Sequence, residues 1–372
     1  MMKFNSFINV LKNNSLRGGA KSRSLNFEVL RIIAMFLVMI IHYNVPINGA
    51  PTWDSIQGSP FKALGIIQLK SISFVCVNVF ILVSGYFGIS WKLKSFLAFI
   101  YQLAFWAAFT YLITLVFGYH GFDTKTFCLR ILNCCDANWF YLSYIGLYLF
   151  SPVLNAFIGH SDCKTIGRFL VAFYLMAWIF GYVTQQSIEF NRGCSFVSLI
   201  GLYICGAFLR KTECRWKTIP AKTYLLLFFV LGWFLAACSI ITLRLGFTKD
   251  VYGYLNPIVL AEGVFLFLFF AKIEIKSCRN IIMFFSSSAL AVLLLHYSPD
   301  TCGIYTDKLR WINNNCAVPF ILIMFFMLTL FIFAAIVDKL RMASWIVVWN
   351  AASHLLQMRK HKNHGHVPPV KV

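Results

Sequence analysis

The sequence predicts an all-α integral membrane protein, a polytopic bundle of about ten transmembrane helices. Hydrophobic residues make up 59% of its 372 residues, and charged residues make up only 12%. Long apolar runs recur along the whole chain, which a single water-soluble core of this length would not require. Because a helix needs about twenty apolar residues to cross a bilayer, runs of that length indicate membrane spans.

Ten apolar segments come close to the length that a membrane span needs, and the sixth is the shortest. An even number of spans puts both termini on the same side of the membrane. In chain order we expect helices at residues 27–47, 68–88, 95–117, 139–158, 167–184, 195–209, 223–245, 254–271, 280–297 and 318–337.

Basic residues indicate the orientation of these segments, because short cytoplasmic loops are enriched in lysine and arginine. With the N-terminus in the cytoplasm, 24 of the 33 basic residues fall in cytoplasmic segments. We therefore expect both termini in the cytoplasm. Residues 1–24 should form a disordered tail, residues 25–337 the membrane domain, and residues 338–372 a basic tail.

The net charge of +20 does not indicate a nucleic acid partner. The basic residues are spread over many short loops, as orientation signals and contacts with anionic lipids would be, and are not gathered on one domain. The expected partner of this charge is the lipid bilayer. The sequence carries no signal for the oligomeric state.

The twelve cysteines show no zinc-ligand spacing, and we predict no metal site. Cys302 and Cys316 share one predicted outer loop, and Cys128, Cys134 and Cys135 share another. Disulfide bonds could form in these loops if that side of the membrane is oxidising.

Arg31 and His42 are the first candidates for a functional site. Eleven residues at about 100° each come to roughly three turns plus 20°, so both side chains face the same way about 16 Å apart along the axis. Glu28 is placed to pair with Arg31. Ionisable groups inside a membrane are costly and mark functional sites. The alternatives are a helix-packing role for His42 and an arginine that reaches back to lipid phosphate.

Two further ionisable residues fall inside predicted spans. His296 ends the ninth segment at a depth comparable to that of His42, although it could also be an interfacial residue beside Tyr297. Glu262 lies near the middle of the eighth segment, where a carboxylate needs a partner or a proton. Its alternative role is that of a neutral, hydrogen-bonded acid.

The second segment closes with Ser84, Gly85 and Tyr86. Because this segment should run inward, these residues reach the level of Arg31. Glycine there permits the close approach of a ligand or a backbone, and small residues at a helix end are also common packing elements.

These segments together resemble the integral-membrane acyltransferase-3 family, whose members include O-acetyltransferases of bacterial surface polysaccharides. The resemblance extends over about residues 25–337, and the arginine-to-histidine spacing with the Ser-Gly-Tyr segment is its most specific part. It is carried by Asn26-Phe-Glu-Val-Leu-Arg-Ile-Ile-Ala-Met35 leading to His42, Val-Phe-Ile-Leu-Val-Ser84-Gly85-Tyr86, Trp139-Phe140, Tyr144-Ile-Gly-Leu-Tyr-Leu149, Ser151-Pro-Val-Leu-Asn155 and Leu-Leu-Leu-His296.

The resemblance implies an acyl-CoA-dependent O-acyltransferase that acts on groups other than aminoacyl groups. The transferred group would usually be acetyl, moved from cytoplasmic acetyl-CoA to a hydroxyl of a cell-surface or exported polysaccharide or glycolipid. The enzyme would lie in the bacterial cytoplasmic (inner) membrane, with acetyl-CoA as a donor substrate and no tightly bound cofactor. His42 matches the essential histidine of the family, and Arg31 matches its first-helix arginine.

One segment departs from the family pattern. Many relatives carry Arg-x-x-Arg in the loop after the Ser-Gly-Tyr segment, whereas this loop offers only Lys92 and Lys94. Lysine can still meet phosphate as a point charge. The expected substrate- and donor-binding residues are Arg31, Glu28, Ser84, Gly85, Tyr86, Lys92, Lys94, Trp139, Glu262 and His296.

The chemistry of acyl transfer favours a histidine at the reacting centre. A sugar hydroxyl is a poor nucleophile at neutral pH, and imidazole is a base whose pKa lies near ambient pH. His42 is the candidate, either as a base in one step or as a covalent acyl carrier.

The main alternative function is a proton-coupled transporter or flippase of a lipid or glycan intermediate, with His42, Glu262 and His296 as a proton relay. Ten helices fit such a protein equally well. The sequence shows no repeated halves and predicts no paired broken helices, which favours the enzyme. A sensor or scaffold is a third possibility, for which the sequence gives no positive signal.

Overall fold

The computed structural model describes residues 24–49, 51–132, 139–184, 189–246 and 251–364. Over these residues the chain is helical and contains no strand. The predicted disordered tail at residues 1–24 lies outside the described residues apart from Ser24, as do residues 365–372 of the predicted C-terminal tail.

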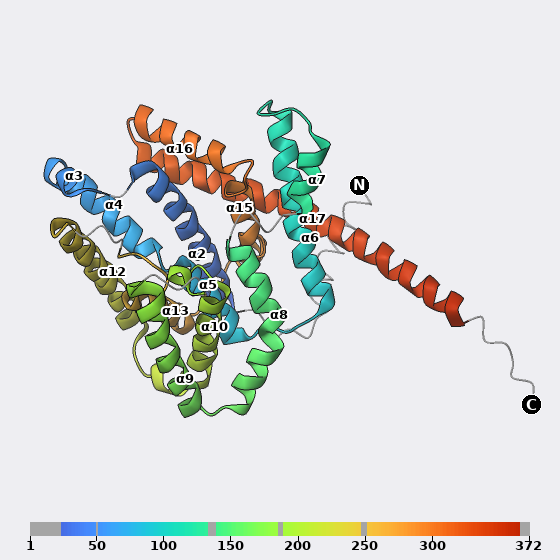
Figure 1. Ribbon diagram of the computed structural model, residues 1–372, viewed down its shortest axis with the longest axis horizontal. Coiled ribbons are helices and arrows are strands. Elements are labelled where there is room, and N and C mark those ends of the chain that lie inside the picture. Colours follow the sequence, from blue (N-terminus) through green and yellow to red (C-terminus); the bar gives the residue numbers. More distant parts are fainter. Residues whose placement is uncertain (1–23, 50, 133–138, 185–188, 247–250, 365–372) are drawn as a thin grey trace, which may run out of the picture.

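Helices occur at all ten predicted positions, joined by short helices in the connections (Figure 1). The principal helices are α2 (Leu25–Tyr43), α4 (Pro60–Ser73), α5 (Cys76–Phe87), α6 (Leu93–Val116), α8 (Trp139–His160), α9 (Cys163–Met176), α10 (Phe196–Lys211), α12 (Ala221–Arg244), α13 (Pro257–Lys272), α14 (Arg279–Ser286), α15 (Ala289–His296) and α17 (Pro319–His364). The shorter elements are η1 (Asn44–Asn48), α3 (Trp53–Gly58), α7 (Thr124–Leu132), η2 (Ala177–Val183), η3 (Asn191–Gly193), α11 (Glu213–Trp216) and α16 (Cys302–Asn315).

The bundle is that of a multi-pass membrane protein. In the described part of the chain, eight helical segments are long and apolar enough to cross a bilayer. α10 and α13 have 16 residues each and are shorter than the other spans. Large apolar side chains face outward, for example Leu226 and Trp233 of α12, which are 63% and 58% exposed. An outer surface of this kind is stable in contact with lipid.

Two of the predicted spans are interrupted, which corrects the expectation of unbroken helices. The second span consists of α4 and α5, with a break at residues 74–75, and the ninth consists of α14 and α15, with a break at residues 287–288. Serine hydroxyls compete for backbone hydrogen bonds, which accounts for a break within the run Ser286-Ser287-Ser288. Irregular backbone at membrane depth is tolerated where it is buried in protein or lines a cavity.

Local sequence explains where several helices begin. The Asn256 side chain accepts a hydrogen bond from the Ile258 amide at 2.8 Å, and Pro257 occupies the first position of α13. Asp162 caps α9 by accepting a bond from the Thr165 amide at 2.8 Å. These caps determine where α9 and α13 begin. The apolar pattern of the sequence predicts only that a helix occurs there.

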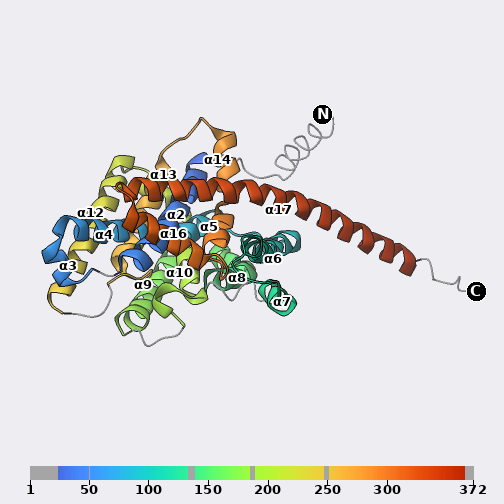
Figure 2. The same ribbon diagram turned by 90° about the horizontal axis from the view of Figure 1, so that it is seen from above.

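α2 lies at the centre of the bundle, in contact with α4, α5, α13, α14 and α15. Figure 2 shows α2 and α5 in the middle, with α12 and α6 on opposite sides. α5 packs closely on α10, because a Cβ atom on Gly85 would lie 2.0 Å from the Tyr203 carbonyl oxygen and one on Gly206 would lie 2.2 Å from that of Leu82. Only glycine permits this approach of two helix backbones.

The last helix does not end at residue 337, where the sequence suggested that a tail begins. α17 continues to His364 and extends beyond the other helices (Figure 1). Asp338 and Arg341 are buried and form two hydrogen bonds of 2.8 and 2.9 Å, and the indole of Trp106 on α6 donates to Asp338 at 3.2 Å. In the sequence, the charges of Asp338 and Arg341 suggested a cytoplasmic tail. In the structure, these two residues are part of the contact between α6 and α17.

The connection that contains Cys302 and Cys316 does not form the disulfide that the sequence left possible. Both cysteines are free, as is Cys128. Cys302 begins α16 and Cys316 follows its end, so the 14-residue helix separates them by roughly 20 Å, far beyond the reach of a disulfide. Cys134 and Cys135 lie outside the described residues.

Candidate active site

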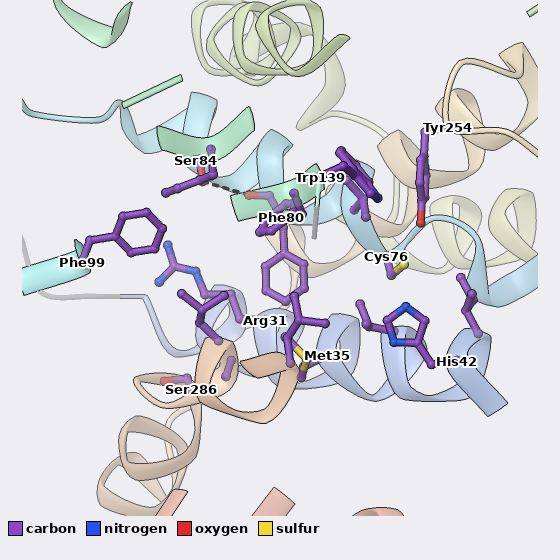
Figure 3. A pocket seen from close by; sticks show the side chains of 18 of the residues that line it. Arg31, Met35, His42, Cys76, Phe80, Ser84, Phe99, Trp139, Tyr254 and Ser286 are labelled. Atoms are coloured by element: carbon purple, nitrogen blue, oxygen red, sulfur yellow. Dashed lines mark hydrogen bonds between the residues drawn. The ribbon is translucent and has the colours of Figure 1, made fainter. Parts of the chain in front are cut away.

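A cavity of about 350 Å³ lies inside the bundle, and both Arg31 and His42 line it (Figure 3). Its walls come from α2, α5, α6, α8, α14, α15 and the connection before α13. Arg31 lies at one end with Ser84, Phe99 and Ser286, and His42 lies at the other end with Cys76 and Tyr254 (Figure 3). The eleven-residue stripe predicted from the sequence thus forms one wall of a single cavity.

His42 contacts His296 directly, across two helices that are far apart in the sequence. Its Nδ1 lies 2.9 Å from Nε2 of His296, and Nδ1 of His296 lies 2.6 Å from the Val292 carbonyl oxygen. Since a carbonyl can only accept, Nδ1 of His296 carries the proton and donates to Val292. In the neutral pair Nε2 of His296 is then the acceptor and Nδ1 of His42 is the donor.

With this assignment Nε2 of His42 is unprotonated, and its lone pair is not used in the bond to His296. A neutral imidazole has one protonated nitrogen, and in His42 that nitrogen is Nδ1, bonded to His296. Nε2 is therefore able to accept a proton or to attack an electrophile in the cavity. His296, at 2% exposure, is buried behind this ring and orients it.

Aromatic rings hold the histidine pair in place. Tyr297 stacks on His42 with ring centroids 4.0 Å apart and planes 16° apart. Tyr305 of α16 lies 5.0 Å from the His296 ring, and its hydroxyl donates to the Met39 carbonyl at 3.1 Å. Burial raises the pKa of the Tyr305 phenol, which keeps the hydroxyl protonated as a donor.

Arg31 forms the expected pair with Glu28, with Nη1 and Oε1 2.7 Å apart. Glu28 is 3% exposed, whereas the Arg31 side chain is 29% exposed and lines the cavity. One carboxylate bond uses only part of the guanidinium, which has five N–H donors. Arg31 can therefore donate to an anion in the cavity while Glu28 holds its position.

Two more predicted residues line the cavity. The Ser84 hydroxyl donates to the Phe80 carbonyl at 3.0 Å, shown dashed in Figure 3. Trp139 of α8 lies 5.8 Å from the ring of Tyr254, centroid to centroid, and both line the cavity.

The other residues of the Ser-Gly-Tyr segment face helix contacts. Gly85 lies against the backbone of Tyr203, and the Tyr86 hydroxyl donates to Glu213 at 3.0 Å. Neither residue is part of the cavity lining. Both residues therefore lie in contacts between helices.

The two loop lysines expected near the donor do not line the cavity either. Lys92 and Lys94 are exposed, and the ammonium of Lys94 lies 5.1 Å from the centre of the Trp349 ring on α17. Both lysines therefore lie on the surface of the bundle, away from His42.

Glu262 is fully buried in α13 and lies apart from the histidine pair. Within the described residues neither of its carboxylate oxygens has a hydrogen-bond partner. A Cβ atom on Gly232 of α12 would lie 2.9 Å from Oε1, which places the carboxyl group at the contact between α12 and α13. Glu262 does not line the cavity.

The structure adds residues that sequence reasoning missed. Tyr254, Ser286 and Ser287 line the cavity. The ammonium of Lys339 on α17 donates to the hydroxyls of Ser287 and Ser288 at 2.8 and 2.9 Å and so holds the break between α14 and α15. The run of three serines within an apolar segment was a signal for this break. Nothing in the local sequence indicated Tyr254 or Lys339.

Among the described residues, no group of three or more histidine, cysteine, aspartate or glutamate side chains could hold a metal ion.

Comparison with known families gives one match. The family model described as an acyltransferase domain, acyltransferase 3, matches residues 24–347, which include every residue of the cavity lining. No curated protein and no solved structure matches the chain.

Proposed function

The chain belongs to the acyltransferase-3 family, and from this premise we propose that it is an O-acetyltransferase. The donor is acetyl-CoA, and the acceptor is a hydroxyl of an exported or cell-surface polysaccharide or glycolipid. The observation that carries the proposal is the single cavity with Arg31 at one end and the free Nε2 of His42 at the other. The two groups lie about 16 Å apart along α2, comparable to an extended pantetheine arm.

The proposed orientation puts the start of α2 in the cytoplasm of a bacterium, with the enzyme in the inner membrane and both termini in the cytoplasm. The distribution of lysine and arginine supports this orientation. Arg31 then lies toward the cytoplasmic donor, and His42 lies toward the external acceptor. The acetyl group crosses most of the membrane while the nucleotide stays on the cytoplasmic side.

In the one-step route, His42 is the general base. Its Nε2 takes the proton of the acceptor hydroxyl as the oxygen attacks the thioester carbonyl. The C–S bond breaks, and the leaving CoA thiolate takes up that proton from the imidazolium, which restores the neutral base. His296 accepts the hydrogen bond from Nδ1 throughout and stabilises the imidazolium that forms, as an orienting acceptor does in other histidine-based sites.

In the two-step route, the same nitrogen carries the acyl group. Nε2 attacks the thioester carbonyl, the C–S bond breaks, and the CoA thiolate leaves and is protonated from solvent. The acceptor hydroxyl then attacks the acyl-imidazole, the C–N bond breaks, and the hydroxyl proton passes to the released Nε2 and on to solvent. CoA release in the absence of an acceptor distinguishes the two routes. Without acceptor, the carrier route releases one CoA per protein in a burst, whereas the one-step route releases none.

The proposed function is tested with purified protein in nanodiscs supplied with labelled acetyl-CoA and a glycan acceptor. His42→Ala should abolish CoA release and glycan acetylation while protein yield and membrane insertion stay normal. His160→Ala, at the exposed end of α8, is the matched control and should retain activity. Normal acetylation by His42→Ala would overturn the catalytic role. Mass analysis of surface glycan from cells with and without the protein identifies the acceptor.

The two interrupted spans keep a proton-coupled transporter or flippase as a second candidate, because broken helices at a central cavity are common in transporters. The position of Glu262 argues against the proposed relay, since Glu262 does not line the cavity of His42. Proteoliposomes discriminate between the two functions. Uptake coupled to protons without CoA release supports a transporter, and CoA release that depends on His42 supports the enzyme.

A further inference from the structure

A second cavity, of about 700 Å³, lies at the end of the bundle where α2 begins. It is bounded by the first residues of α2, the end of α13, the start of α14 and Lys217. Four of its lining side chains are cationic, Lys217, Lys272, Lys276 and Arg279, and one is a carboxylate, Glu274. The cavity is therefore strongly positive, in contrast to the mainly apolar cavity of His42.

Part of this charge is neutralised within the protein. Lys276 pairs with Glu274 at 3.1 Å, and Lys217 pairs with Glu213 at 2.7 Å. The ammonium of Lys272 donates to the carbonyl of Lys217, which leaves its charge uncompensated. Among the described residues, Arg279 has no carboxylate partner. Lys272 and Arg279 thus supply two positive charges to any anion in this cavity.

α14 and the first turns of α2 lie between the two cavities. Arg279 lines the basic cavity and Ser286 lines the cavity of His42, and α14 separates them by seven residues, about 10 Å along the axis. At the start of α2, Leu25 and Asn26 line the first cavity, and Arg31, five residues after Asn26, lines the second.

We propose that the basic cavity is a phosphate-binding site that takes the nucleotide end of acyl-CoA. This inference rests on the proposed function for the identity of the donor. Arginine and lysine form charge-assisted bonds with phosphate oxygens. With the 3′-phosphate at Lys272 and Arg279, the pyrophosphate lies toward Arg31, and the pantetheine arm covers the roughly 16 Å from Arg31 to His42. The site replaces Lys92 and Lys94, which do not line either cavity.

Binding of adenosine 3′,5′-bisphosphate tests the site without requiring catalysis. The protein is held in nanodiscs of zwitterionic lipid, and binding is measured calorimetrically in the His42→Ala background. Arg279→Gln should weaken binding about tenfold, equivalent to ~1.4 kcal/mol. Lys272→Gln should have a similar effect. Arg279 is exposed, so its substitution should leave the fold intact. Arg168→Gln, an exposed arginine of α9, is the matched control and should bind normally.

A second measurement separates the phosphates from the rest of the donor. In the enzyme with His42 intact, Arg279→Gln should raise KM for acetyl-CoA about tenfold. It should leave KM for acetyl-pantetheine, which lacks the nucleotide, unchanged. An equal increase for both donors would overturn the assignment, because the effect would then not depend on the phosphates.

A phospholipid headgroup offers similar chemistry, and a third measurement distinguishes it. Nanodiscs containing phosphatidylglycerol are compared with zwitterionic ones by mass spectrometry of retained lipid. If Arg279→Gln loses bound phosphatidylglycerol while adenosine 3′,5′-bisphosphate binds normally, the site is a lipid site and the nucleotide assignment is wrong. If the variant loses nucleotide binding but the protein never acetylates, the nucleotide site stands and the proposed function fails.

Discussion

Two polar clusters lie within the bundle, and they differ in what surrounds them. His42 and His296 bond to each other at 2.9 Å, and His42 lines a cavity. Asp338 and Arg341 bond to each other at 2.8 and 2.9 Å, but neither lines that cavity, and Trp106 and Gln102 of α6 complete the surroundings of the carboxylate. The first cluster leaves one ring nitrogen available to a substrate, whereas the second directs its bonds to the protein itself.

This difference separates a chemical role from an architectural one. Inside a membrane both clusters are costly, so cost alone does not identify a catalytic residue. A pair whose bonds all end within the protein stabilises the contact of helices. A pair with a free lone pair facing a cavity can take part in a reaction. The two clusters should therefore respond oppositely to substitution.

The largest expected effect on stability is at the Asp338 pair. Asp338→Ala leaves the Arg341 charge buried and unpaired, which should cost about 3–5 kcal/mol. The measurement is the unfolding midpoint in detergent, together with the specific activity of the protein that remains folded. Asp338→Leu combined with Arg341→Met should be less destabilising than either single alanine variant, because no buried charge remains. A fully active and equally stable Asp338→Ala protein would contradict the architectural role.

The largest expected effect on turnover, apart from loss of His42 itself, is at His296. His296→Leu removes the acceptor that orients His42 and should lower kcat about 100-fold, within the range of general acid–base effects. KM for acetyl-CoA should change little. The unfolding midpoint should fall less than in Asp338→Ala, because two buried hydrogen bonds are lost but no buried charge is left unpaired.

His296→Asn provides the conservative test of this positioning role. The amide oxygen can accept the hydrogen bond from Nδ1 of His42 and should recover part of the lost turnover. If the leucine and asparagine variants are equally impaired, His296 acts by some means other than accepting this bond.

At the opposite end of the cavity, Arg31 should affect donor binding. Removing Arg31 alone would leave Glu28 unpaired at 3% exposure, so both charges are removed together in Glu28→Gln with Arg31→Gln. KM for acetyl-CoA should rise about tenfold, or ~1.4 kcal/mol, while kcat stays within about a factor of two. An unchanged dependence of the rate on acetyl-CoA concentration would count against the donor role of Arg31.

The sequence predicted the parts of this site that depend on helical periodicity. Arg31 and His42 share a stripe because they are eleven residues apart on one helix, and both line one cavity. His296 was expected at the depth of His42 from the direction of the spans alone. Its contact with His42 could not be derived, because it depends on how α15 packs on α2.

Features that depend on tertiary packing were not predicted. Tyr254 reaches the cavity from a connection, and Lys339 reaches Ser287 from α17, where its charge had suggested a tail. The sequence likewise could not show that Asp338 and Arg341 are buried in a helix contact, since an aspartate and an arginine three residues apart occur equally on exposed helices. Whether each of these charged residues is exposed or buried in a helix contact depends on the tertiary packing around it, which the local sequence does not show.

The smallest expected effect is at Trp106, which donates a single hydrogen bond of 3.2 Å to Asp338. Trp106→Phe keeps an aromatic ring at this fully buried position but removes the indole N–H, and the lost bond should cost about 1 kcal/mol. Asp338 retains both bonds from Arg341, so the pair should persist and the specific activity should be normal. A lowered unfolding midpoint with unchanged kcat would place Trp106 with the architectural cluster. A fall in kcat comparable to that of His296→Leu would show that the two clusters are coupled, and the distinction between them would then fail.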